Sequence, residues 1–417
     1  MLNGKNGSHE LPTPPAAGAL PTNRYAHVVG WGMSVPSRVM TNDDLARIVD
    51  TSDEWITSRT GIRERHIAGP KDSTSTLATQ AGRAALELAD IDPNDVDLVI
   101  VATCTPDHLF PATACLVQDA LGCGRAGAFD VSAACSGFIY GLTLGTQMIR
   151  TGAMRTVLVI GAETLSRFIN WKDRATCVLF GDGAGAFVLQ ARETPGGLLT
   201  SVLGADGSGG DSLIVPAGGC KLPASFETIR DNQHTLQMDG KAVYRFATRV
   251  MTESVREVTA KAGVPLDQVQ LIVPHQANRR IIESSARTLG LSEERFVVNL
   301  DRFGNTSAAS IPIAVCEAVR DGRLRPDDNV VLVAFGAGLT WGSALLQWDA
   351  TPPAEPTGLA RFRRQLSYSF AGLRSTARRG WRRVEGLLFG SQSPEGGQQP
   401  PKRGKTDEPH KPKEPVA

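Results

Sequence analysis

The feature that most constrains this chain is an internal repeat, in which the same series of motifs occurs twice. Leu98 of the first apolar run matches Leu271 of a later run at an offset of 173, and Leu158 matches Leu332 at an offset of 174. The matched segments are VDLVIVAT (96–103) with VQLIVP (269–274), TVLVIGAE (156–163) with NVVLVAFGAG (329–338), and FGDGAGAFVLQ (180–190) with FGAGLTWGSALLQ (335–347). Two similar halves of this size indicate a duplication with a pseudo-twofold axis.

The repeated runs are typical of strands that are buried on both faces, because they are continuously apolar. Helical patterns such as 76–91 lie between them, with small and apolar residues on one face. This alternation predicts an α/β fold, with duplicated halves at 25–195 and 196–350. Matching loops of the two halves should meet near the axis, which places the segment around Cys135 near the segment around Asn305.

The two ends of the chain differ from this body. Residues 1–24 are rich in Gly, Pro and Ser and are expected to be a disordered leader, and 391–417 a disordered tail. Residues 351–358 are expected to be a linker. The segment 351–417 holds 13 basic and 6 acidic residues, whereas 1–350 holds 31 basic and 37 acidic residues. The C-terminal part is therefore a candidate interaction segment on a neutral to acidic body.

Residues 359–390 are expected to form a basic amphipathic helix. Apolar residues recur at spacings of three and four and form one stripe, and eight arginines lie outside it. The stripe consists of Phe362, Leu366, Phe370, Leu373, Ala377, Trp381, Val384 and Leu388. Such a helix is typical of a membrane-surface or partner-binding element. The alternative is a helix folded onto the body.

Composition excludes several classes of protein. The seven cysteines are scattered and form no CxxC pair, which argues against a disulfide framework or a zinc site and favours a reducing cytoplasm. No apolar run is long enough to span a bilayer, and no stretch of signal-peptide type opens the chain. We expect a cytoplasmic protein, peripheral at the membrane if 359–389 binds lipid, with no nucleic-acid partner.

Three strand-to-helix corners carry residues that could do chemistry. In DVSAACSGFIYG (130–141), Cys135 falls where an expected helix begins, and unpaired N–H groups there favour a thiolate. In VPHQANRRI (273–281), His275 follows a buried strand, where α/β sites open. In RFGNTSAASIPIAV (302–315), Asn305 precedes a run of small residues. The ordinary alternatives are a packed cysteine, a core histidine and a capping asparagine.

These residues carry a family resemblance. Residues 25–349 resemble the β-ketoacyl-acyl-carrier-protein synthase III family of thiolase-fold condensing enzymes. The resemblance implies a thiolase-like α/β fold, in which central sheets of the two duplicated halves pack around buried helices. The resemblance rests on TNDDLARIVDTSDEWITSRTGIRERHI (41–67), SAACSGF, FGDGAGA, VPHQAN, GNTSAAS and FGAGLTWGSALL. It implies decarboxylating Claisen condensation of an acyl-CoA primer with malonyl-acyl-carrier-protein, the initiation of fatty-acid synthesis, with no metal and no permanently bound cofactor.

The resemblance also assigns roles to residues. Cys135 would become acylated in a ping-pong mechanism, while His275 and Asn305 donate hydrogen bonds to the malonyl thioester oxygen. The backbone N–H groups of Cys135 and Ala337 would form the oxyanion hole, although relatives often have glycine in place of Ala337. CoA would bind at Trp55, Arg59, Arg174 and Asn278.

Further implied sites involve the carrier protein, the acyl chain and a second subunit. The acidic carrier protein would dock on Arg245, Arg249, Arg280 and Arg287, whose alternative is a solvated helix face. The acyl pocket would be lined by Cys104, Leu165, Phe180, Met238 and Phe335, with Phe110 reaching in from the other subunit of a homodimer. Cys104 stands where some relatives have threonine.

Two other functions remain open at this stage. The first is an acyltransferase or condensing enzyme of the same fold that acts on another acceptor in secondary metabolism. The second is a non-catalytic acyl-binding scaffold, against which the intact Cys135 argues. Release of carbon dioxide from a malonyl thioester separates condensation from transfer, and labelling of Cys135 separates an enzyme from a scaffold.

Overall fold

The computed structural model describes residues 24–349 together with 377, 380, 381 and 384. The expected leader, linker and tail lie outside the described residues, apart from Arg24. Of the expected amphipathic helix, only Ala377, Gly380, Trp381 and Val384 are described, and all four are helical and exposed. The chain divides into compact units at 1–372 and 373–417. Over the described residues, no helix combines the length and apolarity that crossing a bilayer requires.

The first unit is built on two sheets. One sheet has the strand order β1-β7-β6-β4-β5, formed by β1 (Tyr25–Ser34), β4 (Leu98–Ala102), β5 (Gly127–Val131), β6 (Thr156–Glu163) and β7 (Gly183–Arg192). The other has the order β11-β12-β13-β8, formed by β8 (Gly197–Ala205), β11 (Leu271–Pro274), β12 (Asp328–Gly336) and β13 (Thr340–Trp348). The boundary expected between 195 and 196 falls between β7 and β8.

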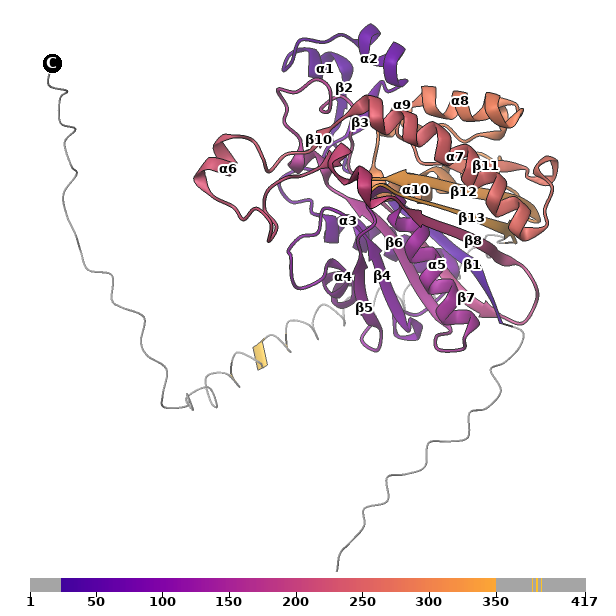
Figure 1. Cartoon of the computed structure of the whole chain (residues 1–417). Coiled ribbons are helices and arrows are strands. Elements are labelled where there is room, and N and C mark those ends of the chain that lie inside the picture. The colour runs from indigo at the N-terminus through magenta and orange to yellow at the C-terminus, as the bar shows by residue number, and fades with distance from the viewer. Residues whose placement is uncertain (1–23, 350–376, 378–379, 382–383, 385–417) are drawn as a thin grey trace, which may run out of the picture. The chain divides into compact units, whose positions relative to one another are not determined.

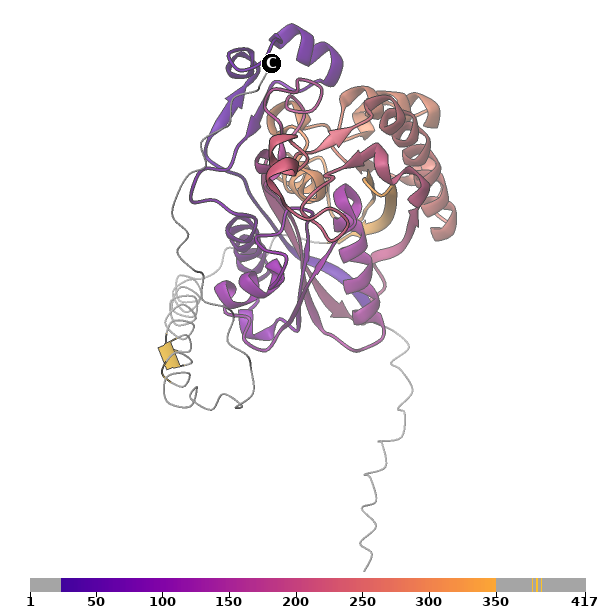
Figure 2. The same cartoon turned by 60° about the vertical axis from the view of Figure 1, so that its left-hand side comes forward.

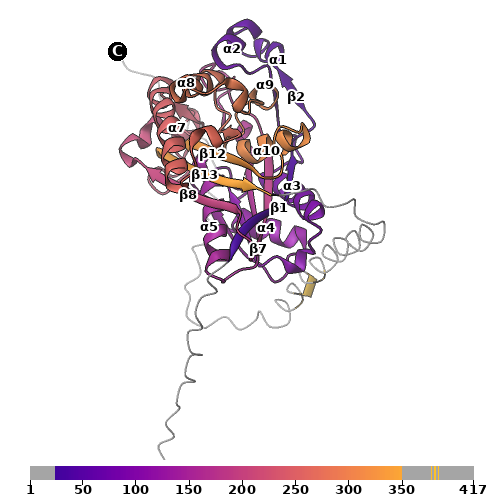
Figure 3. The ribbon, with the colours of Figure 1, turned by 90° about the vertical axis from the view of Figure 1, so that its right-hand side faces the viewer.

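Five layers follow from how the helices cover these sheets. The middle layer is α5 (Gly137–Arg150) with α10 (Ser310–Arg320), and its apolar side chains share one core with the facing sides of both sheets. The outer layers are α3 (Thr74–Ala89) with α4 (Thr113–Leu121) on the first sheet, and α7 (Gly240–Ala262) with α8 (Arg279–Leu289) on the second. Figure 3 shows α7 and α8 on the left, α3 on the right and α10 between them. The thiolase-like α/β class is therefore confirmed.

Smaller elements surround these layers. Figures 1 and 2 place the indigo segment that carries α1 and α2 at one end of the body. The bounds are β2 (Val39–Thr41), α1 (Asn42–Ala46), α2 (Asp53–Thr60), β3 (Glu64–His66), β9 (Leu213–Ile214), α6 (Phe226–Arg230), β10 (Gln237–Met238) and α9 (Leu300–Phe303).

The ladder registers correct the offset of the repeat. Leu98 on β4 pairs with Val157 on β6, and Leu271 on β11 pairs with Val330 on β12. Both parallel pairs therefore have the same register. The offset of 173 that relates Leu98 to Leu271 also relates Val157 to Val330. The match of Leu158 with Leu332 was wrong by one position. Successive strand residues face opposite sides, so Leu158 packs in the outer core and Leu332 in the central one.

The two turns that lead into the helices of the middle layer repeat the same backbone. The expectation of a strand before Asn305 was wrong, because α9 precedes it and Asn305 forms only an isolated bridge with Phe180. A 3₁₀ turn η2 (Ala134–Ser136) precedes α5, and a 3₁₀ turn η7 (Ser307–Ala309) precedes α10. Ala134 has φ of 45° and Ser307 has φ of 49°, and the same offset relates these two residues. A non-glycine residue in this left-handed region is uncommon and costs free energy. The duplication thus extends to a strained turn, and the two turns lie against each other beside the site, as the repeat predicts.

Candidate active site

Cys135 lies in η2, between the end of β5 and the start of α5. It was expected in the first turn of the helix, and it lies just before that turn, because the left-handed Ala134 bends the chain first. The β12 end packs directly on it: a Cβ added to Gly336 would lie 2.7 Å from the Cys135 nitrogen. Glycine at 336 therefore lets the loop that holds Ala337 approach the cysteine backbone.

The ionisation of Cys135 differs from the sequence-based expectation. The pKa of the Cys135 thiol is raised to about 12, chiefly by burial and to a smaller extent by the nearby Glu163, while Ser307 opposes the rise. Cys135 as a whole residue is only 8% exposed. The helix start, which was expected to favour the thiolate, is outweighed by the removal of water from the thiol. Cys135 rests as a neutral thiol and must lose its proton when it reacts.

His275 follows β11 and is buried. Its Nδ1 lies 2.7 Å from the hydroxyl oxygen of Ser310, and its ring packs edge-on against Phe335 at a centroid distance of 5.2 Å. Burial lowers the pKa of His275 to about 3. The ring is therefore neutral. When Ser310 donates to Nδ1, the proton sits on Nε2, which is the tautomer that can donate to a ligand.

Asn305 is fixed by its backbone and by one end of its side chain. Its N–H donates to Leu179 at 2.8 Å, and its carbonyl accepts from Gly181 at 3.0 Å. Its Oδ1 accepts from the Ser307 N–H at 2.9 Å. The side-chain NH₂ is therefore the group that Asn305 can offer to a ligand.

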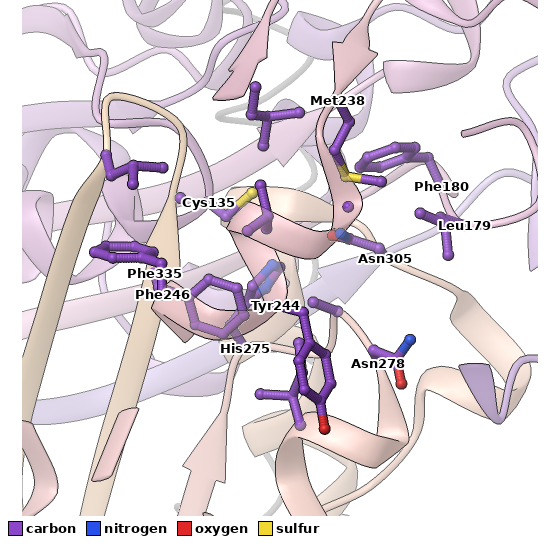
Figure 4. A pocket seen from close by; sticks show the side chains of 17 residues that line it. Cys135, Leu179, Phe180, Met238, Tyr244, Phe246, His275, Asn278, Asn305 and Phe335 are labelled. Atoms are coloured by element: carbon purple, nitrogen blue, oxygen red, sulfur yellow. The ribbon is translucent and has the colours of Figure 1, made fainter. Parts of the chain in front are cut away.

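Cys135, His275 and Asn305 line one cavity. Figure 4 shows their side chains around the same hollow, with Phe180, Met238 and Phe335 beside them. This histidine cavity has a volume of about 90 Å³. A larger cavity of about 560 Å³ adjoins it, and Cys135 lines both. A substrate at Cys135 can thus extend into either cavity.

Five of the six expected acyl-pocket residues line these two cavities. Cys104, Leu165 and Phe180 line the larger cavity, and Phe180, Met238 and Phe335 line the histidine cavity. Phe110 lines neither and is 85% exposed, next to Leu109 at 83%. Its role across a dimer interface stays a prediction. Ala337 also lines the larger cavity, and its φ is not positive, so alanine in place of glycine causes no backbone strain there.

The expected CoA residues come together at α2. The guanidinium of Arg59 lies 4.9 Å from the centroid of the Trp55 ring, and that of Arg174 lies 5.1 Å from it. Asn278 lines the histidine cavity, and its side chain donates to the Arg59 carbonyl at 3.1 Å while it caps α8. This chain of contacts runs from the mouth of the cavity to Trp55.

The four expected carrier-protein arginines lie on two adjacent helices. Arg245 and Arg249 are on α7, Arg280 and Arg287 are on α8, and all four are exposed. Arg249 forms an ion pair with Glu253 on its own helix, and the Arg280 guanidinium lies 6.0 Å from the Tyr244 ring centroid. The set is a cationic surface beside the histidine cavity, which Tyr244 also lines.

Three polar residues of the site were missed by the sequence analysis. Ser310 orients His275, Ser307 lowers the pKa of the Cys135 thiol, and Glu163 is a fully buried carboxyl that accepts from Ser307. A signal for Glu163 was available, because an acid ends the otherwise apolar run TVLVIGAE. The two serines lie within the quoted GNTSAAS motif, where nothing in the spacing marks which hydroxyl faces the site.

Comparison with known proteins agrees with this geometry. Residues 129–207 match the family model for 3-oxoacyl-[acyl-carrier-protein] synthase III, and 259–348 match the model for its C-terminal part. A β-ketoacyl-[acyl-carrier-protein] synthase III from Roseiflexus sp. (strain RS-1) is 56% identical over 326 residues, which are 78% of this chain and 99% of that protein.

Solved structures give the same result. The crystal structure of 3-oxoacyl-[acyl-carrier-protein] synthase III from Aquifex aeolicus VF5 is 46% identical with a TM-score of 0.72, covering 78% of this chain and 100% of that one. The priming β-ketosynthase of the R1128 polyketide pathway is 36% identical with a TM-score of 0.74, covering 81% and 100%. The chain belongs to the β-ketoacyl-[acyl-carrier-protein] synthase III family of condensing acyltransferases.

Proposed function

We propose that this enzyme condenses an acyl-CoA primer with malonyl-acyl-carrier-protein, with loss of carbon dioxide, through an acyl-Cys135 intermediate. The product is a β-ketoacyl-acyl-carrier-protein, the first condensation product of fatty-acid synthesis. One observation carries the assignment of the residues: Cys135, His275 and Asn305 come from three separate connections between elements and line one cavity.

In the first half-reaction, the Cys135 sulfur attacks the thioester carbonyl of the acyl-CoA. The new S–C bond forms, the bond to the CoA sulfur breaks, and the Cys135 proton ends on the CoA thiol. The tetrahedral oxyanion is stabilised by the backbone N–H groups of Cys135 and Ala337. The close approach of Gly336 to the Cys135 nitrogen brings these two backbone segments together.

In the second half-reaction, His275 Nε2–H and the Asn305 NH₂ donate to the thioester oxygen of the malonyl group. Decarboxylation leaves an enolate on that oxygen, so donors aimed there stabilise the transition state more than the ground state. The enolate carbon attacks the acyl-Cys135 carbonyl and releases the cysteine. Neutral His275 suits this role, because its low pKa keeps it uncharged at physiological pH.

The substrates reach Cys135 from the Trp55 end of the site. The adenine of CoA stacks with Trp55 between Arg59 and Arg174, which also provide charge for phosphates. The pantetheine arm passes Asn278 into the histidine cavity, and the carrier protein docks on the arginines of α7 and α8. The acyl chain occupies the larger cavity. The substrates serve as thioester carriers, and we propose no permanently bound cofactor.

The experiment that tests this function is mass spectrometry of Cys135 after incubation with a panel of acyl-CoAs, followed by addition of malonyl-acyl-carrier-protein. We expect acylation at Cys135 alone, then loss of the acyl group with one carbon dioxide released per turnover. Cys135→Ala should remove the label entirely, because no other cysteine in the described part of the chain lines the histidine cavity. Label on another cysteine, or transfer without carbon dioxide, would contradict the proposal.

We also propose that the enzyme is a homodimer. Leu109 and Phe110 are more than four-fifths exposed although both are large and apolar, and Leu109 lines the mouth of the larger cavity. A second copy that covers them would bury apolar surface and close that mouth. Sedimentation of the protein should give the mass of two chains, and Phe110→Asp should give one.

For residues 359–389 we propose a contact with anionic membrane, with the body working in the cytoplasm or at the membrane surface. The support is the apolar stripe and the eight arginines of the sequence. The described members of the stripe, Ala377, Trp381 and Val384, are helical and exposed.

A further inference from the structure

Glu163 is a buried carboxyl that the mechanism above does not use. It lies at the end of β6 and is 0% exposed. It forms no ion pair with a lysine or arginine of the described residues; instead it accepts hydrogen bonds. The donors are the hydroxyls of Thr103 (3.2 Å), Thr105 (2.5 Å) and Ser307 (3.0 Å), the Cys104 thiol (3.1 Å) and the Cys104 backbone N–H (3.2 Å to each oxygen). A buried carboxyl without a cation is costly to keep, so its place beside the nucleophile calls for an explanation.

Ser307 connects this carboxyl to Cys135. Its hydroxyl lies 3.0 Å from Glu163 Oε1 and 3.9 Å from the Cys104 sulfur. Ser307 and Cys135 line the same larger cavity from the packed turns η7 and η2, and Ser307 lowers the pKa of the Cys135 thiol. The packed turns η2 and η7 and the end of β6 thus bring a thiol, a hydroxyl and a carboxyl together at one cavity. A hydroxyl can accept a proton from one neighbour and donate its own to the other.

The backbone holds Ser307 in this place at a cost. Its φ of 49° is in the left-handed region, and its N–H donates to Asn305 Oδ1 at 2.9 Å. The turn also approaches β6 very closely: a Cβ added to Gly161 would lie 2.2 Å from the Ala308 carbonyl oxygen. Glycine at 161, two residues before Glu163, permits this approach. Two separate features therefore set the contact of Ser307 with Glu163.

We propose that Glu163 takes up the Cys135 proton through Ser307 during acylation. This inference rests on the proposed function and adds the proton acceptor that the first half-reaction needs. As the Cys135 sulfur forms its bond to the acyl carbon, its proton passes to the Ser307 oxygen, and the Ser307 proton passes to Glu163. When the tetrahedral intermediate collapses, the proton returns by the same path to the departing CoA sulfur. Atoms and charge balance, and Glu163 is ready again.

The electrostatics of the site support this role. His275 is the other candidate base, and its pKa of about 3 makes it a weak one. Burial raises the pKa of Glu163 above its ordinary value, which makes it a better proton acceptor than an exposed carboxylate. The titratable groups that face it are the thiols of Cys104 and Cys135, and burial raises the pKa of both.

The test compares acylation of Cys135 by rapid quench and mass spectrometry in the wild type, Glu163→Gln and Ser307→Ala over a range of pH. We expect each variant to acylate about 10²–10⁴-fold more slowly at pH 7, the usual contribution of a positioned base. The double variant should be no slower than the single ones, because both act on one path. In the wild type, the acylation rate should fall at low pH as Glu163 becomes protonated. In the two variants this acid limb should be absent, and the acylation rate should simply rise with pH.

Thr103→Val is the matched control. Thr103 donates to the same carboxyl, on the Oε2 side away from Ser307, so this variant should keep a rate within a few-fold of wild type and keep the acid limb. After slow loading of the acyl group, Glu163→Gln should consume malonyl-acyl-carrier-protein at close to the wild-type rate.

Two outcomes would overturn the relay while leaving the proposed function intact. One is wild-type acylation in either Glu163→Gln or Ser307→Ala. The other is an equal loss in both half-reactions with the acid limb retained, which would mean that Glu163 only supports the structure. A wild-type enzyme that does not acylate at Cys135 would instead contradict the proposed function itself. If Glu163→Gln does not fold, the acylation rate of Ser307→Ala alone tests the relay. In that variant Glu163 keeps its hydrogen bonds from Thr103, Thr105 and Cys104, so the buried carboxyl stays satisfied.

Discussion

Cys135 and His275 are both buried, and burial has opposite consequences for their roles. Loss of water raises the pKa of the thiol to about 12 and lowers the pKa of the imidazole to about 3. Both groups are therefore neutral at rest. For His275 this is the state that donates to an enolate oxygen, whereas for Cys135 it is a barrier that the reaction must overcome. The two half-reactions should accordingly depend on different residues.

Replacement of the donors should separate these half-reactions. His275→Ala and Asn305→Ala should each slow malonyl decarboxylation by about 10²–10³-fold, the usual effect of removing one donor to a developing oxyanion. Acylation of Cys135 should fall much less. The measurement is carbon dioxide release from malonyl-acyl-carrier-protein beside acylation by mass spectrometry. Equal losses in both would show that His275 acts mainly as the base for Cys135.

The depressed pKa of His275 also predicts how stability depends on pH. The unfolded chain takes up a proton on this histidine below about pH 6.5, whereas the folded chain does so only near pH 3. The stability that His275 contributes is therefore complete above pH 6.5 and is lost as pH falls from 6.5 towards 3, at about 1.4 kcal/mol per pH unit.

Urea unfolding at pH 7.5 and pH 5.5 would measure this effect. The wild type should lose more stability between these values than His275→Gln, which lacks the titrating group. Decarboxylation should show no acid limb from His275 over the same range. If the two proteins lose stability in parallel, the histidine of the folded state titrates near its ordinary pKa.

At the scale of elements, the apolar runs were sufficient to predict the strands, but they did not fix the register. The run TVLVIGAE became β6 with the expected bounds, and the run 96–103 became the shorter β4. A continuously apolar strand carries no alternation, so Leu158 and Val157 are equivalent in the sequence although they face different cores. The one-residue error in the repeat follows from this.

The sequence was sufficient to predict those site residues that combine a reactive side chain with a position in a connection between expected elements. Cys135 follows the left-handed Ala134, His275 follows the strand β11, and Asn305 lies two residues before the left-handed Ser307. The sequence motifs marked all three. Glu163 and Ser307 were missed because their importance lies in a contact across 144 residues of sequence. Burial was the other missing quantity: the helix start suggested a thiolate, and only the packed structure shows how little water reaches the sulfur.

The approach of η7 to β6 gives a prediction for Gly161→Ala. The added Cβ would meet the Ala308 carbonyl oxygen, a backbone atom that cannot move away alone. We expect a loss of about 1–3 kcal/mol of stability, as for other overpacked cores, and slower acylation because Ser307 is displaced from Glu163. Thermal unfolding and the acylation assay would measure both.

Gly207→Ala is the matched control, since a Cβ there would meet nothing within 4 Å. It should leave both quantities close to wild type. A Gly161→Ala protein as stable and active as this control would show that η7 can move without consequence.

At the scale of the whole molecule, the catalytic body and the C-terminal segment should separate. Truncation after Asp349 removes the segment but keeps the hydrogen bond of the Asp349 carboxylate with His27. We expect the truncated enzyme to condense its substrates at the wild-type rate and to lose co-sedimentation with anionic vesicles. High salt should weaken vesicle binding by the full chain, because each basic residue contributes about 1 kcal/mol through charge.

There are two controls. One is the full chain with neutral vesicles, and the other is a variant with glutamine in place of the eight arginines between 361 and 383. Both should abolish sedimentation without changing condensation. A truncated protein that unfolds, with a full chain that ignores anionic vesicles, would show that the segment packs on the body instead.

The strained turns at Ala134 and Ser307 have a consequence for the history of this enzyme. Each half of the chain carries the same left-handed corner at the same place in the repeat. A gene duplication would have copied this strained turn into both halves. Substitutions could then change the residues in each copy while the backbone stayed the same. One copy acquired the sulfur nucleophile one residue after the bend, at Cys135; the other has Ala308 there and a hydroxyl at the bend itself. A single ancestral shape now serves two chemical roles, which face each other across the axis that once made them identical.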